Sequence, residues 1–340
     1  MRFDFEATGI GSLPFKDPKT ACRLIFDNFK TIPFWPQLPR ASFLENMYVQ
    51  FSETLPGLVL DETARTIRID TSRVAADIER VYEKYLEGDL EFFRISQKYA
   101  AGFYEFLEAL KGAAKSVKFA KAQVTGPISY ALFLTDQNKK PVIYDKDLFE
   151  VLTKVLAMKA KWQVKKIKKI YPNVIVFIDE PYLASVGSSY VSVNIEEAFK
   201  KLDELVDAVK AEGALTGVHC CGNTDWSILL KRDIDILNFD AYNFIKEFSL
   251  YAADAKNFLK KGGTLAFGIV PSSDAIENET DSSLAAKLEA GLRLLKDKGI
   301  EEAEVSALVT PSCGLGTLDE ARAKKILRCA RALSTRFRKR

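Results

Sequence analysis

Short apolar runs alternate along the chain with longer segments whose apolar residues recur every three or four positions. Segments 148–170, 195–211 and 283–298 show this spacing most clearly, which predicts amphipathic helices. The short runs between such segments predict eight strands, with last residues near Gly11, Gln37, Val124, Asp179, His219, Asp240, Ile269 and Thr310. Eight strands that alternate with helices are typical of a (β/α)₈ barrel, so the pattern predicts an α/β fold of the TIM-barrel type.

Two segments depart from this regular pattern. The second expected strand, near Ile32–Trp35, is crowded by Pro33, Pro36 and Pro39, and proline cannot donate a backbone hydrogen bond to a sheet. Residues 58–71 alternate between apolar and polar side chains, which predicts a β-hairpin inserted between barrel units that could cover one mouth of the barrel. No low-complexity linker interrupts the chain, so we expect residues 1–340 to form one domain.

Composition narrows the class of protein. The 340 residues are 47% hydrophobic, enough for one large core, and the net charge of +3 gives no reason to expect a nucleic-acid partner. No apolar run is long enough to span a bilayer and the N-terminus lacks the apolar stretch of a signal peptide, so we expect a cytoplasmic protein without a membrane partner. Five cysteines in so long a chain do not resemble a disulfide framework and could bind metal.

The strongest chemical signal surrounds the single histidine of the chain. His219 and Cys221 lie two residues apart at the end of a predicted strand, so both side chains point the same way. An imidazole and a thiolate suit Zn²⁺, which needs further ligands to complete a tetrahedron. Cys313, which follows the apolar run Val305–Val309, is the best candidate for a third ligand. The alternative is an ordinary core histidine among buried cysteines, because free cysteine is often buried.

Other polar residues are expected at the same end of the predicted barrel. They are Ser12, Gln37, Gln123, Asp179 with Glu180, and Asp240, each at or just beyond the carboxyl end of a predicted strand. Barrel enzymes build their active sites on this face. The pattern therefore favours a catalytic metal over a purely structural one.

Five motifs occur in the order found in the catalytic, C-terminal half of cobalamin-independent methionine synthase: Gly9–Pro14, Val124–Pro127, Ile178–Pro181, His219–Cys221 and Pro311–Leu315. The chain resembles this family over nearly its whole length. The run from His219 to Thr224 is also similar to the zinc site of the corrinoid-linked coenzyme M methyltransferases, in the barrel superfamily of uroporphyrinogen decarboxylase.

The resemblance implies a set of site residues. It implies Zn²⁺ bound by His219, Cys221 and Cys313, with Asp240 in the position of an exchangeable glutamate ligand of the family. The shorter Asp240 could instead act through water or cap the next helix. A bound zinc ion would convert a substrate thiol to its thiolate.

The resemblance also implies how homocysteine is held. Asp179 is expected to bind its amino group and, with Asp240, to serve as a catalytic residue. Ser12 and the backbone around Gly11 are expected to bind its carboxylate. Gln123 completes the expected substrate-binding residues. The simpler alternatives are that Asp179 caps a turn and that Ser12 caps a helix.

Two departures from the family bear on the methyl donor. Full-length members carry a further N-terminal barrel that helps to hold methyltetrahydrofolate, so we expect a short, core form without that partner domain. A family histidine that protonates the folate leaving group is absent from the corresponding stretch, Gly268–Glu277. An amine leaving group needs a proton, whereas a cobalt leaving group does not. We therefore expect a methylcorrinoid donor, although Asp274 or Glu277 could act as the acid for a folate.

The sequence thus predicts a zinc-dependent methyltransferase that moves a methyl group from a methylcorrinoid to homocysteine and yields methionine. The donor could be methylcobalamin or a separate corrinoid protein. Three alternatives remain open: another thiol substrate such as coenzyme M, a methyltetrahydrofolate donor, or a barrel that binds zinc or a corrinoid without catalysis.

Overall fold

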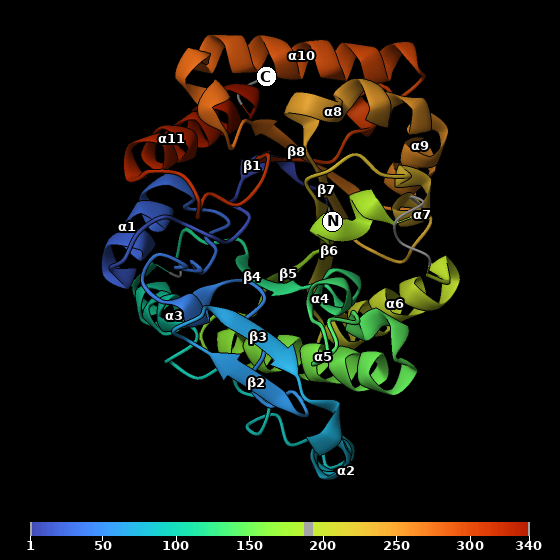
Figure 1. The fold of residues 1–340 in the computed structure, drawn as a ribbon. Helices are drawn as coiled ribbons and strands as arrows, with labels where there is room; N and C mark the ends of the chain where they lie inside the picture. The colour runs from blue at the N-terminus through green and yellow to red at the C-terminus, as the bar shows by residue number, and fades with distance from the viewer. Residues whose placement is uncertain (1, 114, 187–192, 339–340) are drawn as a thin grey trace.

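The computed structural model describes residues 2–113, 115–186 and 193–338. Its centre is a seven-stranded parallel sheet with the order β1-β9-β8-β7-β6-β5-β4. Figure 1 shows the strands curled around a common centre with the helices outside them. The strands are β1 (Asp4–Ala7), β4 (Ala120–Thr125), β5 (Val174–Asp179), β6 (Leu215–Cys220), β7 (Ile236–Phe239), β8 (Thr264–Val270) and β9 (Ala307–Pro311). The predicted α/β class is confirmed.

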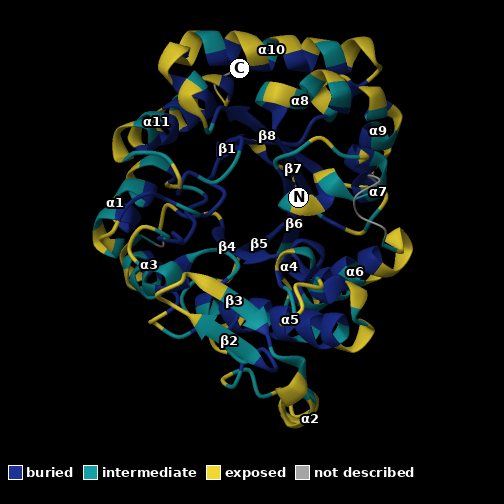
Figure 2. Ribbon diagram, in the orientation of Figure 1, coloured by how far each residue is buried: buried dark blue, intermediate teal, exposed yellow. Residues whose placement is uncertain are grey.

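The helices connect successive strands and cover the outer face of the sheet. They are α1 (Pro18–Asn28), α2 (Val74–Leu86), α3 (Ala101–Ala113), α4 (Pro127–Phe133), α5 (Lys146–Lys168), α6 (Ile195–Ala211), α7 (Trp226–Leu230), α8 (Ala241–Phe248), α9 (Ala252–Lys260), α10 (Asp281–Asp297) and α11 (Glu320–Phe337). The predicted helices at 148–170, 195–211 and 283–298 correspond to α5, α6 and α10. Figure 2 shows the strands of the central sheet and the inward faces of the helices buried, and the outward faces of the helices exposed.

The second expected strand is the one that does not form. Phe34 makes a single parallel bridge to Lys121 of β4, and Gln37 makes one to Ser12, beyond the end of β1. The Gln37 amide donates to the Gly11 carbonyl (3.1 Å). Pro33 and Pro36 have no N–H group, so a continuous ladder cannot form through them. Residues 31–37 thus lie between the two edge strands of the sheet without becoming a strand. β1 also ends at Ala7, ahead of the expected Gly11.

The predicted hairpin at 58–71 is confirmed. β2 (Leu58–Asp61) and β3 (Thr66–Ile69) pair antiparallel in a separate two-stranded sheet. The turn between them ends at Arg65, whose φ of 53° lies in the left-handed region. In Figure 1 this hairpin lies beside the central sheet, in front of α5.

Hydrophobic residues form two separate cores. The larger one lies between the sheet and the surrounding helices. The smaller one lies on the other face of the strands, inside the curl, and contains Phe3, Ile32, Phe119, Ile175, Phe177, Ile236, Ala266 and Leu308. Side chains alternate along a strand. The next inner-face residues, two positions further along each strand, therefore lie nearer the carboxyl end of the sheet.

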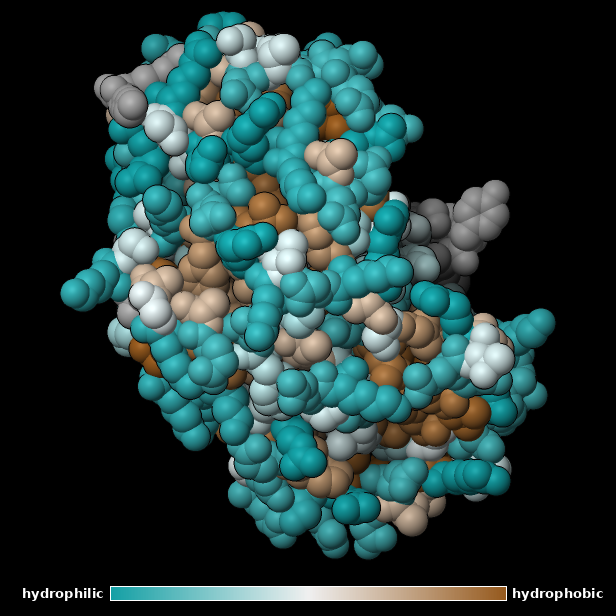
Figure 3. All heavy atoms as spheres, turned by 90° about the vertical axis from the view of Figure 1, so that its left-hand side faces the viewer, coloured by the Kyte–Doolittle hydropathy of each residue, from teal (hydrophilic) through white to brown (hydrophobic). Residues whose placement is uncertain are grey.

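None of the described helices is both long enough and apolar enough to cross a membrane. Figure 3 shows one face of the molecule that is mostly hydrophilic, with hydrophobic residues gathered in separate patches.

Candidate metal centre and its pocket

The inner face of the sheet changes from apolar to polar along β5, β6 and β7. In β5 the inner positions read Ile175, Phe177 and then Asp179, and in β7 Ile236 is followed by Asn238. In β6 the same alternation places His219 on the inner face, with Cys221 directly beyond the strand. The polar residues therefore gather at the carboxyl end of the sheet, above a floor of hydrophobic side chains.

Three of these side chains come together as a candidate metal centre. One ligand atom each of His219, Cys221 and Cys313 lies within 4.8 Å of the others. Zn–S bonds of about 2.3 Å and Zn–N bonds of about 2.1 Å in a tetrahedron place ligand atoms roughly 3.5–3.8 Å apart. The buried Nε2 of His219 has no hydrogen-bond partner among the described residues. An orphaned imidazole nitrogen beside two thiols fits a metal ion, and one tetrahedral position would remain for a substrate.

Asn238 determines which nitrogen of the His219 imidazole carries the proton. Its Oδ1 lies 2.5 Å from Nδ1 of His219, and its amide nitrogen donates to the Ala266 carbonyl (2.9 Å) and to Thr310 Oγ1 (2.8 Å). Since Oδ1 can only accept, the proton of His219 lies on Nδ1 and the lone pair on Nε2. Sequence reasoning did not single out Asn238. Its signal was a polar residue inside a buried strand, two positions before Asp240.

The electrostatics of the three side chains favour a thiolate at Cys221. The pKa of Cys221 is lowered because the Cys313 thiol donates a hydrogen bond to it, and the neighbouring His219 acts in the same direction. The pKa of Cys313 is raised because its proton is held against Cys221. Burial works to lower the pKa of His219, but the neighbouring Cys221 thiolate outweighs burial and raises that pKa. Metals bind the thiolate form of cysteine, so this pairing prepares the site for a cation.

A neighbouring loop holds Cys313 in place, and a third thiol, that of Cys220, lies away from the centre. The Cys313 backbone is clamped by Ser272, whose hydroxyl accepts from its N–H (3.0 Å) and donates to its carbonyl (2.8 Å). Cys220 lies on the opposite face of β6, where it is fully buried in the outer core. Burial raises the pKa of Cys220 to about 12. The adjacent cysteines therefore have different environments, and only Cys221 belongs to the centre.

A cavity of about 430 Å³ opens directly above the centre. Its lining includes all three candidate ligands together with Asp179, Ser12 and Gln37. The remaining lining residues are Ile10, Pro39, Arg40, Asn46, Met47, Arg65, Pro181, Gly314, Gly316 and Thr317. The lining residues thus come from the hairpin turn at Arg65 and from the carboxyl ends of β5, β6 and β9, among other segments.

Asp179 is the buried acid of this cavity. Its Oδ1 has no hydrogen-bond partner among the described residues. Burial raises the pKa of Asp179 above its usual range, although His219 and Lys121 oppose the shift. Asp179 therefore lines the cavity with one unused acceptor, which suits a cationic group of a ligand better than a turn cap.

Lys121 is a buried cation that sequence reasoning missed. It lies on the inner face of β4, where its Nζ donates to the Ile10 carbonyl (2.5 Å) and lies 4.4 Å from the centre of the Phe177 ring. Burial lowers the pKa of Lys121 below its usual range, and the charge of Asp179 opposes this effect. Its signal was a lysine two positions before Gln123 in a run of otherwise small or apolar residues.

The predicted substrate residues near the N-terminus occupy different positions. Ser12 lines the cavity, and its hydroxyl accepts a hydrogen bond from the Gly316 amide (3.2 Å). Gln123 is not among the lining residues, and its amide donates to the Trp35 carbonyl (2.9 Å) and accepts from Lys121 (3.3 Å). A Cβ at Gly11 would lie 2.6 Å from the Gln37 side chain and 3.1 Å from that of Gln123. Gly11 is thus required by close packing beneath the cavity.

Asp240 is bound by its own helix. It is the N-cap of α8: Oδ1 accepts from the Asn243 amide (3.0 Å) and Oδ2 from the Asn243 side chain (2.6 Å). Burial raises the pKa of Asp240 even though these hydrogen bonds oppose it. It is not part of the three-residue group that could hold a metal ion. The geometry favours the capping alternative over direct ligation.

Asp274 and Glu277, the candidate acids after β8, face away from the cavity. Both pair with Arg322 of α11, at 3.3 Å and 2.9 Å, and their side chains are 84% and 54% exposed. Neither lines the cavity above the metal centre. No carboxyl group from this described loop is placed to protonate a leaving group there.

Glu180 links two of the sequence motifs structurally. Its carboxylate accepts hydrogen bonds from the backbone of Ile128 (3.0 Å) and Ser129 (2.7 Å) at the start of α4. A Cβ at Gly126 would lie 2.2 Å from this carboxylate. Burial raises the pKa of Glu180 to about 7 against the effect of these bonds. Asp179 and Glu180 are adjacent, but only Asp179 faces the cavity.

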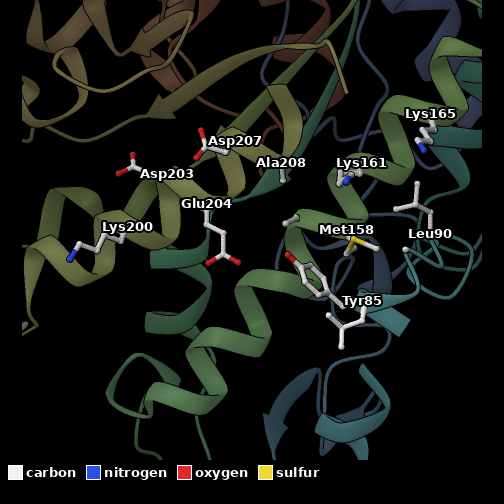
Figure 4. Close-up of a pocket in the computed structure, with 13 residues that line it drawn as sticks. Tyr85, Leu90, Met158, Lys161, Lys165, Lys200, Asp203, Glu204, Asp207 and Ala208 are labelled. Atoms are coloured by element: carbon white, nitrogen blue, oxygen red, sulfur yellow. The ribbon is translucent and has the colours of Figure 1, made fainter. Parts of the chain in front are cut away.

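A second cavity, of about 740 Å³, lies on the outer surface between α2, α5 and α6. Figure 4 shows its lining, where Tyr85 and Met158 lie among lysines and acids of both long helices. Lys161 and Lys165 pair with Glu212. Its described lining residues include no group of candidate metal ligands. The cavity above the end of β6 is therefore the better candidate for the functional site.

Comparisons with known proteins assign the chain to no family. No family model matches the chain, and no curated protein matches it. Among solved structures, the chain is similar to a B12-independent methionine synthase from Shewanella sp. W3-18-1 in complex with selenomethionine, at 19% identity and a TM-score of 0.47, over 69% of this chain and 67% of that one.

The chain is also similar to a GH113 β-1,4-mannanase, at 13% identity and a TM-score of 0.43, over 98% and 99% of the two chains. A hyperthermophilic β-glucosidase from Pyrococcus furiosus aligns at 12% identity and a TM-score of 0.35, over 99% and 96%.

Proposed function

We propose that the protein is a zinc-dependent methyltransferase that transfers a methyl group from a methylcorrinoid to the thiol of homocysteine, giving methionine. The observation that carries the proposal is the group of His219, Cys221 and Cys313 at the floor of a cavity that also presents the unpartnered carboxylate of Asp179. The proposal treats residues 1–340 as one domain built on a (β/α)₈ barrel, in which residues 31–37 take the place of the second strand.

The three side chains are suited to zinc, which when bound would supply a Lewis acid that stabilises the thiolate form of a substrate thiol. His219 offers its Nε2 lone pair because Asn238 holds the proton on Nδ1. Cys221 and Cys313 offer two sulfur ligands from different strand ends. Two thiolates leave a bound cation less electron-poor, so a substrate sulfur beside it stays nucleophilic.

Asp179 is the residue that favours an amino-acid thiol. Asp179 lines the cavity and keeps one carboxylate oxygen, Oδ1, without a partner among the described residues, and the same cavity is lined by Ser12 and the loop after β9. A carboxylate in this position can accept hydrogen bonds from the ammonium group of homocysteine, while Ser12 would donate to its carboxylate. Together they would fix the amino acid with its sulfur toward the candidate ligands.

The surroundings of the cavity favour a donor that leaves without a proton. The sulfur lone pair forms the new C–S bond as the methyl–cobalt bond breaks, and the electron pair of that bond stays with the cobalt. A folate amine would instead need a general acid. Asp274 and Glu277 are paired with Arg322 outside the cavity, so the described loop supplies no such acid.

The test is a direct assay of the zinc-loaded protein with methylcobalamin. We expect methionine to form from homocysteine, and a thiol without the amino group, such as coenzyme M, to react at least about tenfold less efficiently because the contact with Asp179 is lost. Comparable efficiency for both thiols would contradict the role of Asp179. X-ray absorption that shows four protein ligands, with no change on addition of homocysteine, would contradict catalysis itself.

A further inference from the structure

We propose that Arg40 and Arg65 form a subsite at the mouth of the cavity for an anionic group of the methyl donor, which in a free corrinoid is the phosphodiester of its nucleotide loop. The inference rests on the proposed function, because it assumes a corrinoid donor. It assigns a role to the hairpin β2–β3, which the metal centre and the thiol site leave without one.

Both arginines line the same cavity as the candidate metal ligands. They are exposed, whereas His219 is 3% exposed and Asp179 4% exposed. The guanidinium groups therefore lie at the open end of the cavity and the candidate ligands at its floor. Asp179 is the one acidic side chain among the described lining residues, and it lies at the buried end. The mouth is cationic.

Arg65 is held in place without losing its hydrogen-bond donors. Its guanidinium lies over the ring of Phe43, 5.3 Å from the ring centre. Contact through the flat face leaves the N–H groups at the edge of the guanidinium free. The left-handed backbone of Arg65, with φ of 53°, ends the turn that brings this side chain to the cavity. Such a conformation is uncommon for a residue with a Cβ.

Arg40 is held by a different segment of the cavity lining. Its guanidinium donates to the carbonyl of Thr317 (3.1 Å), another lining residue, and keeps its remaining N–H groups for a ligand. Neither arginine is in an ion pair with another described residue. The acids nearest in sequence to Arg65 are already used, since Glu62 pairs with Lys98 (2.9 Å) and Asp61 accepts from the Ala64 amide (2.8 Å).

Two guanidinium groups from separate segments, neither of them in an ion pair with a described residue, match the chemistry of a phosphodiester. Arginine presents its donors in a planar fork that binds phosphate oxygens in pairs. An anion bound at the mouth would keep the charged end of the donor away from Asp179 and leave the space above the candidate metal ligands for the methyl group. The subsite thereby contributes to donor affinity and donor choice without touching the reacting atoms.

The experiment compares two donors in three variants. Methylcobalamin carries the nucleotide loop and its phosphodiester, whereas methylcobinamide lacks both. The variants are Arg40→Gln, Arg65→Gln and the control Arg80→Gln, whose guanidinium also lies 5.3 Å from a phenylalanine ring, that of Phe92, but which does not line the cavity. Steady-state KM and kcat are measured for each donor, and equilibrium binding of each corrinoid is measured without homocysteine.

For methylcobalamin we expect KM and the binding constant to weaken about tenfold in Arg40→Gln and in Arg65→Gln, with kcat little changed, because a charge-assisted contact is lost. For methylcobinamide neither variant should differ from the wild type, and Arg80→Gln should change nothing. Equal losses for both donors, or a rise in the KM of homocysteine in place of that of the donor, would overturn the subsite.

The same measurements separate failure of the subsite from failure of the proposed function. If the wild type binds methylcobalamin with the expected dependence on both arginines but transfers no methyl group, the subsite stands and the methyltransferase proposal is wrong. If the wild type transfers methyl groups from both donors equally well and the arginine variants do the same, the subsite is wrong and the methyltransferase stands. Absence of corrinoid binding in the wild type overturns the subsite.

Discussion

Two neighbouring parts of the sheet's carboxyl end carry similar residues but use them differently. At the ends of β5, β6 and β9, the Asp179 carboxylate and the His219 imidazole each keep a buried atom without a partner, beside two thiols. At the ends of β7 and β8, the acids Asp240, Asp274 and Glu277 are all engaged, one by its own helix and two by Arg322. Residue type alone would have marked both regions as functional.

The difference teaches that unused hydrogen-bonding capacity, rather than the presence of acids, marks the site. A buried polar atom without a partner costs about 1–3 kcal/mol. Such atoms are few in native proteins, and each calls for an explanation. At the first region a cation and a cationic substrate group would satisfy both orphaned atoms, whereas the second region needs no ligand to be satisfied.

The largest expected effect comes from removing a thiol of the first region. We expect Cys221→Ser or Cys313→Ser to weaken zinc binding by more than about a hundredfold and to abolish activity, since losing even an outer partner of a metal ligand costs about 10- to 100-fold. Metal content after dialysis against a chelator measures this, and circular dichroism reports the fold. Cys220→Ala is the matched control and should keep its metal. Stoichiometric zinc in Cys221→Ser would refute the centre.

The next effect concerns the side chain that orients His219. We expect Asn238→Leu to weaken zinc binding about 10- to 100-fold, because the imidazole loses the acceptor that keeps its proton on Nδ1. Competition with a chromogenic chelator gives the affinity. Asn243→Leu makes the same change in the second region and should leave zinc affinity unaltered. Equal losses in both variants would point to general destabilisation and erase the distinction between the regions.

A smaller effect is expected at the buried acid. Asp179→Asn should raise the KM of homocysteine about tenfold, because a charge-assisted hydrogen bond to the ammonium group becomes a neutral one. A thiol without an amino group should show no change in KM. Steady-state kinetics with both thiols measures this, and an equal rise for both would mean that Asp179 acts on the fold or on the centre and not on the amino group.

The smallest effect belongs to the second region. Asp240→Ala removes the N-cap of α8 and should lower the free energy of unfolding by about 1 kcal/mol. Urea denaturation measures this loss. Zinc affinity should stay within about twofold of the wild type, because the ligands come from the first region. Loss of zinc from Asp240→Ala would show that Asp240 is a ligand after all and that the two regions are not distinct.

The sequence predicted site residues only where their relation depends on neighbours that are close along the chain. His219 and Cys221 share a face because they lie two residues apart at a strand end, and this follows from the alternation of a strand. The residues that support them gave weaker signals. Asn238 and Lys121 were polar residues inside buried strands, and their meaning depends on which groups of other strands they meet. Arg65 gave none, since an exposed arginine in a turn is ordinary.

The sequence by itself determined the alternation of strands and helices, the hairpin and the direction in which each strand-end side chain points, because these follow from local periodicity. Tertiary structure decided that residues 31–37 form bridges in place of a strand, because prolines interrupt the ladder on both sides. It also decided which polar side chains remained unpartnered. Whether a carboxylate is bound by Asn243, paired with Arg322 or left free depends on neighbours that are distant in sequence, and only the folded chain brings these together.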